Sequence, residues 1–377
     1  MKNLFLSGIF LFLSGLPVFS QNQTPENESL RKVVLQLPPG DNNPRNSEGD
    51  FITLQNGRIL FIYTRYTGSS PSDHAPAYLA SRFSDDGGKT WSKDDVTVLE
   101  NEGGMNVMSV SLLRFQNGHI ALFYLRKNSA EDCIPIMRIS TDEAKTWSIP
   151  ITCITDRKGY FVLANNRVIQ LKNGRLLMAV SLHNTPDKVE RLFSYYSDDN
   201  GATWNSSSEV PNLSGVVTQV QEPGVIELKD GTVMMFIRTE GRSQYLSWSK
   251  DKGQTWSPMV AGNLPSPLSP ASIARIPSTG DLLAVWNNTD GGDNPKSTDK
   301  RIPLTVAVSK DEGKSWQHVT NIETNPDNRY CYIAIHFTKK DVLLGYCAGP
   351  YRRMLTVTNI SLIRQKELYK KKRKKNK

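Results

Sequence analysis

Short apolar runs alternate with polar turns along most of the chain. The runs 59–63 and 233–237 are typical, and both are rich in residue types that favour β-strands. Each follows an Asn-Gly or Asp-Gly pair, which predicts a β-hairpin because these residues tolerate the positive φ of tight turns. No amphipathic pattern with a 3.6-residue period has useful length, so we predict an all-β chain.

The turn recurs in six places, the last two copies being less regular: 54–59, 115–120, 171–176, 228–233, 276–282 and 337–343. A second motif, Ser-x-Asp-x-Gly-x-(Thr/Ser)-Trp, recurs at spacings of 52 to 60 residues, with Ala for Gly in the second copy. We call its five copies Asp boxes: 84–91, 140–147, 197–204, 249–256 and 309–316. Asp and Gly would supply each turn, and Trp would fill space at the head of the returning strand.

One repeat unit therefore contains about four short strands and two marked turns. This period and strand count predict a propeller blade. Six copies of one turn and five of the other predict a six-bladed β-propeller with four-stranded antiparallel blades over residues 21–365. We expect the last blade to combine residues 325–365 with an N-terminal strand at 33–37, which would close the ring.

The first twenty residues have the features of a secretory signal peptide. Lys2 precedes an apolar stretch at 4–18, and small residues lie near Ser20. The stretch is too short for a spanning helix, and a retained anchor is the alternative. We therefore expect a secreted or periplasmic monomer without a transmembrane segment.

The formal net charge of +9 is concentrated at the ends of the chain. Residues 366–377 carry +7 and Lys2 adds +1, which leaves +1 for everything between them. This near-neutral body does not indicate nucleic-acid binding. We expect 366–377 to be a disordered basic tail, with contact to an anionic surface as the alternative.

The chain has four cysteines, Cys133, Cys153, Cys331 and Cys347. If the protein is exported, they permit three complete disulfide pairings. Cys331 and Cys347 flank one predicted hairpin and are the first candidate pair, while buried free thiols are the alternative. The Cys and His spacings do not indicate zinc, so we expect no metal.

Four arginines lie at predicted strand ends, where an apolar core would have none: Arg45, Arg65, Arg238 and Arg301. Arginine binds a carboxylate through two parallel hydrogen bonds. Inner strands of a propeller converge on its axis, so arginines distant in sequence can meet there and hold a carboxylate. The alternative for each is a solvated strand end or a structural ion pair.

Asp boxes on six predicted blades, together with these arginines, resemble the sialidase (neuraminidase) superfamily, in its secreted bacterial exo-α-sialidase form. The resemblance covers the predicted mature chain. It implies that Arg45, Arg238 and Arg301 hold the substrate carboxylate and that Arg65 contacts the sugar ring. Asn-Ser-Glu follows Arg45, where the family has Arg-x-Pro.

The same resemblance assigns the catalytic residues. Asp73 would be the acid/base, Glu222 the base and Tyr332 the nucleophile; Glu227 and Tyr330 are the rivals of the last two. A sialoside carries its carboxylate on the anomeric carbon, so a neutral tyrosine attacks without like-charge repulsion. Glu222 would take the proton of Tyr332, and Asp73 would protonate the leaving oxygen and then activate water, giving retention without a cofactor.

Two other functions fit the same residues. A glycosidase or lyase for another acidic sugar would keep the arginines and need not use the tyrosine. A non-catalytic propeller that binds glycans or proteins would not need Asp73, Glu222 and Tyr332 to converge.

Overall fold

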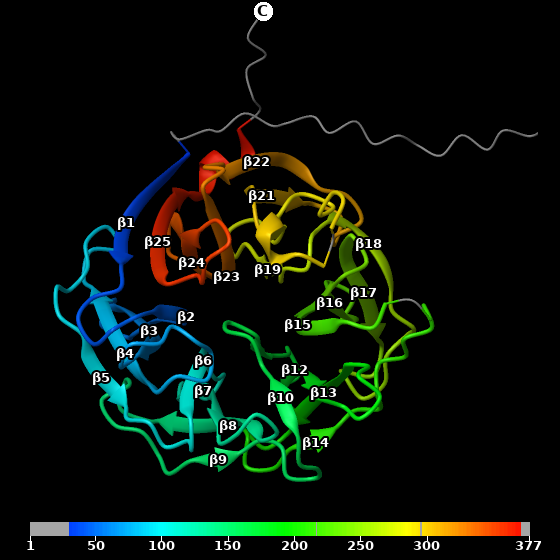
Figure 1. Ribbon diagram of the computed structural model, residues 1–377, viewed down its shortest axis with the longest axis horizontal. Coiled ribbons are helices and arrows are strands. Elements are labelled where there is room, and N and C mark those ends of the chain that lie inside the picture. The colour runs from blue at the N-terminus through cyan, green and yellow to red at the C-terminus, as the bar shows by residue number, and fades with distance from the viewer. Residues whose placement is uncertain (1–29, 216, 295, 371–377) are drawn as a thin grey trace, which may run out of the picture.

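The strands of the computed structural model form five sheets arranged around a central axis (Figure 1). The structure describes residues 30–215, 217–294 and 296–370. Within these ranges there is no α-helix, and the two short 3₁₀ helices are η1 (Thr298–Lys300) and η2 (Gln365–Tyr369). The prediction of an all-β propeller-type chain is confirmed. None of the described helices is long and apolar enough to cross a membrane.

Four sheets have four antiparallel strands each, which follow one another from the axis outwards (Figure 1). The first contains β2 (Asn46–Thr53), β3 (Ile59–Tyr66), β4 (Ala77–Ser84) and β5 (Val96–Leu99). The second contains β15 (Val220–Glu227), β16 (Val233–Thr239), β17 (Ser243–Ser249) and β18 (Val260–Pro265). The third contains β19 (Ser272–Arg275), β20 (Leu282–Asn287), β21 (Leu304–Ser309) and β22 (Gln317–Glu323). The last contains β23 (Asn328–Phe337), β24 (Asp341–Pro350), β25 (Val357–Arg364) and β1 (Arg31–Leu37).

The remaining sheet has nine strands and departs from the predicted four-stranded pattern. One part contains β6 (Asn106–Arg114), β7 (Ile120–Lys127), β8 (Cys133–Ser140) and β9 (Ile151–Thr152). The other contains β10 (Tyr160–Val162), β11 (Val168–Gln170), β12 (Leu176–His183), β13 (Arg191–Ser197) and β14 (Asn205–Ser206). The parts are joined where β10 meets β8 through one parallel pair, Tyr160 and Cys133. Residues 163–167 separate β10 from β11, and both pair with β12.

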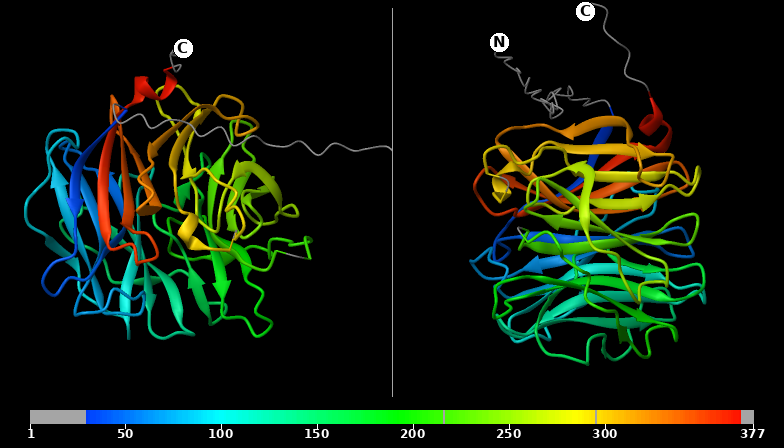
Figure 2. Two further views of the ribbon diagram at one scale, coloured as in Figure 1. Left: turned by 45° about the horizontal axis from the view of Figure 1, so that its top comes forward. Right: turned by 90° about the vertical axis from the view of Figure 1, so that its right-hand side faces the viewer.

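The N-terminal strand joins the sheet formed by the C-terminal part of the chain. β1 pairs antiparallel with β25. Figure 1 and the left view of Figure 2 show the two strands side by side. At the end of β1, Leu37 is buried in an apolar cluster with Phe61 of the first sheet and Leu343 of the last. The prediction that an N-terminal strand completes the last sheet is therefore confirmed.

The chain remains folded past the predicted boundary at residue 365. In η2, Leu368 is buried, and the Tyr369 hydroxyl donates a hydrogen bond to Asp281 (2.9 Å). The predicted signal peptide, residues 1–20, and the last residues of the predicted tail, 371–377, lie outside the described part of the chain.

The Asp boxes are loops closed by their own aspartate. In the first box, Asp86 accepts hydrogen bonds from the Ser84 hydroxyl (2.9 Å) and the Thr90 hydroxyl (2.7 Å). Burial is the largest single effect and opposes ionisation of Asp86, but the hydrogen bonds from Thr90, Ser84 and the Lys89 backbone together outweigh it and lower the pKa of Asp86 to about 2. Trp204 and Trp316 directly precede β14 and β22, as predicted, whereas Trp91 precedes β5 by several residues.

All four cysteines are buried free thiols. Cys331 and Cys347 lie directly opposite each other on β23 and β24 but are not bonded. The first candidate disulfide was therefore wrong, and the alternative of buried thiols is confirmed.

Candidate active site

Four inner strands carry a bulge at the same place, with one residue in the left-handed region. These residues are Glu48 (φ 49°), Ser109 (φ 64°), Glu222 (φ 42°) and Tyr332 (φ 56°). Each lies eight positions before the following turn residue: Asn56, Asn117, Asp230 and Lys340. A bulge redirects a side chain out of the regular alternation of a strand. The repeat thus places one exceptional side chain near the start of each of these strands.

Glu222 connects the predicted nucleophile to a predicted substrate arginine. The Tyr332 hydroxyl donates to one carboxylate oxygen of Glu222 (3.1 Å). Arg238 donates to the other oxygen (2.6 Å), and both members of this ion pair are buried. The Arg301 guanidinium lies over the Tyr332 ring, 5.5 Å from its centroid. Four residues of the predicted set therefore meet in one place.

Burial and the charge of Glu222 keep the proton on Tyr332. Burial, followed by the charge of Glu222, raises the pKa of Tyr332 well above its ordinary value. Burial also disfavours ionisation of Glu222, but Arg238 and Arg301 outweigh it and lower the pKa of that carboxyl group. Neutral Tyr332 therefore donates to ionised Glu222, which is the arrangement a base needs before it accepts the proton.

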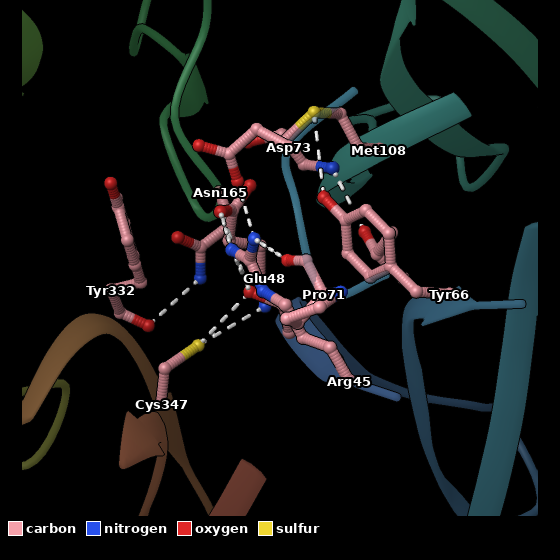
Figure 3. A network of polar contacts seen from close by, with 12 residues as sticks. Arg45, Glu48, Tyr66, Pro71, Asp73, Met108, Asn165, Tyr332 and Cys347 are labelled. Carbon is pink, nitrogen blue, oxygen red and sulfur yellow. Dashed lines mark hydrogen bonds and ion pairs between the residues drawn. The ribbon is translucent and has the colours of Figure 1, made fainter. Parts of the chain in front are cut away.

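Arg45 and Asp73 form the second half of the site (Figure 3). Asp73, in the loop between β3 and β4, is ion-paired with buried Arg45 and is about half exposed. Burial raises the pKa of Asp73, but the charge and hydrogen bond of Arg45 outweigh this effect and hold it below its ordinary value. Buried Lys127 donates to the backbone carbonyl of Asp73 (2.8 Å) and holds the loop against β7.

Asn165 holds the two halves together. Its side-chain amide donates to the carbonyl of Gly49 in β2 (2.9 Å) and to that of Tyr332 in β23 (3.2 Å). Figure 3 shows Tyr332 on one side of Asn165, with Arg45 and Asp73 on the other. We call Arg45, Glu48, Asp73, Glu222, Arg238, Arg301 and Tyr332 the central cluster.

Three residues considered in the sequence analysis have partners outside the central cluster. They are Arg65, the predicted sugar contact, and the rival residues Glu227 and Tyr330. Arg65 is ion-paired with Asp95 (3.0 Å), which also accepts from Arg82, so Arg65 has a structural partner in the loop just before β5. Glu227 pairs with Lys252 near the turns (3.4 Å). Regular alternation would put Tyr330 on the same face of β23 as Tyr332, but the bulge separates them, and Tyr330 packs in the core, edge-on against Tyr346.

Known proteins resemble this chain in sequence and in fold. The model of the BNR repeat-like domain matches residues 83–343, well over half of the chain. The chain belongs to the sialidase superfamily with BNR repeats. A sialidase of Bacteroides fragilis is 24% identical over 328 residues, covering 78% of this chain and 58% of the relative. This member of the superfamily thus spans about three fifths of the relative's length.

Two solved structures place the chain in the same propeller fold. A Dyadobacter fermentans protein of unknown function has a TM-score of 0.71 at 19% identity, covering 89% of this chain and 100% of that one. The leech intramolecular trans-sialidase, in complex with 2,7-anhydro-Neu5Ac, has a TM-score of 0.70 at 15% identity, covering 88% and 70%. At these identities the likeness shows the fold of the superfamily.

Sequence reasoning missed Glu48, Asn165 and Lys127. A signal for Glu48 was present: like Glu222, it precedes its turn by eight residues. Both strands also carry a nearby glycine, Gly49 or Gly224, whose substitution would collide with a phenylalanine of the next strand. No sequence pattern marks Asn165 or Lys127. Their partners are backbone carbonyls distant in the sequence, which only the folded chain brings close to them.

Proposed function

We propose that this protein is a retaining exo-α-sialidase that removes terminal sialic acids from glycoconjugates. The observation that supports this function best is the Tyr332–Glu222–Arg238 chain of hydrogen bonds, with Arg301 against the tyrosine ring. A carboxylate base on a neutral tyrosine, beside two buried arginines, suits an anionic sugar whose reacting carbon carries the carboxylate. For this ring we propose six blades, with the nine-stranded sheet counting as two.

In the proposed reaction, Tyr332 Oη attacks the anomeric carbon as Glu222 removes its proton. Asp73 protonates the departing glycosidic oxygen, which gives a tyrosyl-linked sugar and the free aglycone. Asp73 then takes a proton from water, water displaces Tyr332, and Glu222 returns the proton to the phenolate. The two displacements give overall retention of configuration.

The substrate carboxylate is assigned to Arg238 and Arg301. Arg238 donates to Glu222 from one of its two terminal nitrogens. The Arg301 guanidinium donates one long hydrogen bond to the Leu268 carbonyl (3.4 Å). Neither guanidinium is saturated by the hydrogen bonds of the described residues. Arg45, the third arginine of the expected clamp, is ion-paired with Asp73 and Glu48, so it would join the clamp only where the substrate carboxylate displaces one of these groups.

The test is turnover of a fluorogenic aryl α-sialoside by wild type, Tyr332→Phe and Tyr330→Phe. Loss of the nucleophilic oxygen in Tyr332→Phe should lower kcat/KM on the order of 10³-fold. Tyr330→Phe is the matched control and should keep near-wild-type turnover, because Tyr330 packs in the core.

Equal activity of the two variants would refute the assigned nucleophile. A wild type inactive on both aryl and natural sialosides would refute the proposed function and favour another acidic sugar or a binding role.

A further inference from the structure

Glu48 occupies the same bulge position as Glu222 and Tyr332, yet the proposed reaction does not use it. Its side chain is buried, and its backbone has φ 49°. Its backbone N–H points to the Cys347 sulfur (3.4 Å), which anchors the bulge to β24. A charged residue in strained backbone on an inner strand indicates a role beyond packing.

The Glu48 carboxyl group occupies Arg45. Terminal nitrogen Nη2 of Arg45 donates to Glu48 Oε1 (3.2 Å) and Ser47 Oγ (3.0 Å). The other terminal nitrogen, Nη1, donates to the Pro71 carbonyl (3.3 Å) and pairs with Asp73. Both terminal nitrogens of Arg45 are thus taken by groups of the protein itself. An external carboxylate would have to displace one of these groups to reach Arg45 (Figure 3).

We propose that Glu48 is a specificity-determining residue: its carboxyl group competes from within the protein for Arg45 and so sets the affinity of the central cluster for the carboxylate of an acidic sugar. This inference rests on the proposed function for the class of substrate. It does not require that the bound sugar be hydrolysed.

The charged groups around Glu48 act in opposite directions. Burial is the largest effect and raises the pKa of Glu48 to about 7; Arg45 and Lys127 oppose this rise, and Asp73 and Glu222 add to it. The other titratable groups that face Glu48 stay neutral between pH 6 and pH 8, because burial raises the pKa of each: Tyr66, Tyr160, Cys133 and Cys347. Burial lowers the pKa of His183, next to Glu222, to about 4, so it also stays neutral.

Between pH 6 and pH 8 Glu48 changes its charge, whereas an acidic sugar does not. The carboxylate of an acidic sugar is ionised from pH 6 to pH 8, whereas Glu48 passes from mostly neutral to mostly ionised. Ionised Glu48 adds a like charge and holds Arg45 more firmly. Binding should therefore weaken as pH rises and should be accompanied by proton uptake; full dependence on protonated Glu48 would give about a tenfold loss across this range.

The experiment is isothermal titration with the 2,3-didehydro derivative of N-acetylneuraminic acid at pH 6 and pH 8. For wild type, Kd should rise about three- to tenfold from pH 6 to pH 8. For Glu48→Gln it should change less than about twofold, because the amide is neutral at both values. Burial also raises the pKa of Asp50 and Glu190 to about 7, so the difference between wild type and variant isolates the contribution of Glu48.

Two controls accompany the variant. The methyl ester of the same probe lacks the negative charge and should bind wild type with little pH dependence. Glu143→Gln removes a carboxylate that is ion-paired with Arg114 in the second Asp box, outside the central cluster, and should behave as wild type. Titration of wild type in two buffers of different ionisation enthalpy measures proton uptake directly, so the absence of uptake would refute the role of Glu48 even if Glu48→Gln misfolds.

The outcomes separate this inference from the proposed function. Equal pH dependence in wild type and Glu48→Gln, or no proton uptake by wild type, would overturn the role of Glu48 even if sialosides are hydrolysed. No binding of the probe at either pH would also overturn it. The expected pH dependence without sialoside turnover would support the role of Glu48 and refute hydrolysis.

Discussion

At the scale of single residues, the central cluster keeps two of its acids, Glu222 and Asp73, ionised, whereas burial raises the pKa of the third, Glu48, to about 7. Arg238 and Arg301 keep Glu222 ionised beside neutral Tyr332, while Arg45 keeps Asp73 ionised. An ionised Asp73 cannot donate a proton, so the proposed acid has to gain one as a substrate enters next to Arg45. The acid step should therefore matter most when the leaving group is poor.

Asp73→Asn tests this point. Turnover of a sialoside with a sugar leaving group should fall about 10²–10⁴-fold, the usual effect of losing a positioned acid/base. Turnover of an aryl sialoside should fall far less, because its leaving group departs with little proton assistance. Measuring kcat/KM for both substrates with one preparation makes the aryl reaction the internal control for folding. Equal losses on both substrates would contradict the acid role.

At the scale of elements, the Asp boxes join neighbouring sheets. In the fourth box, the Gly253 carbonyl accepts from Ser194 of β13 (2.6 Å), and Trp256 donates to the same hydroxyl (3.0 Å). A Cβ added at Gly253 would lie 2.5 Å from Leu177 of β12. The box glycine is therefore required by its positive φ and by close packing against the preceding strands.

Gly253→Ala should be more harmful than the same change in an exposed turn. Gly118 has a similar φ (91° against 90°) but nothing within 4 Å of an added Cβ. Gly118→Ala should cost about 1–2 kcal/mol from backbone strain, and Gly253→Ala about 1–3 kcal/mol more from overpacking. Guanidinium unfolding of both variants measures the difference. Equal destabilisation would show that the box tolerates the added methyl group.

At the scale of the whole molecule, the two ends of the chain meet in one sheet. β1 adds to β25, and Leu37 at its end packs between the first and last sheets. The first box adds a second connection, because Gly88 packs against Leu343 of β24. The ring therefore depends on contacts between residues about 300 positions apart, such as the hydrogen bond between Ser47 Oγ and Cys347 Sγ.

Leu37→Ala should weaken this closure. Loss of a buried leucine costs about 2–5 kcal/mol, and the resulting cavity would lie where the ends of the chain join. Lys32→Ala, at an exposed position of the same strand, should change stability by less than about 0.5 kcal/mol. Urea unfolding followed by tryptophan fluorescence compares the two. A Leu37→Ala variant as stable as Lys32→Ala would show that the closure contributes little.

The strands, the turns and the order of candidate residues could be read from the sequence alone, because they depend on local chemistry. Asn-Gly and Asp-Gly pairs mark turns wherever they occur, and the spacing of the boxes shows the repeat. Tyr332, Glu222 and Arg238 were named from a family resemblance in the order of motifs, and the ring brings them into contact across 110 positions.

Only the tertiary structure decided which charged groups became partners. Arg65 meets Asp95, and Arg45 meets Glu48, since each pairing depends on how a strand twists and where it bulges. The bulge in β23 likewise separates Tyr330 from Tyr332, although regular alternation would put both on one face. The sequence determined which chemical groups were present at the centre, and the geometry of the folded chain determined which of them pair with one another and which keep free hydrogen-bonding capacity among the described residues.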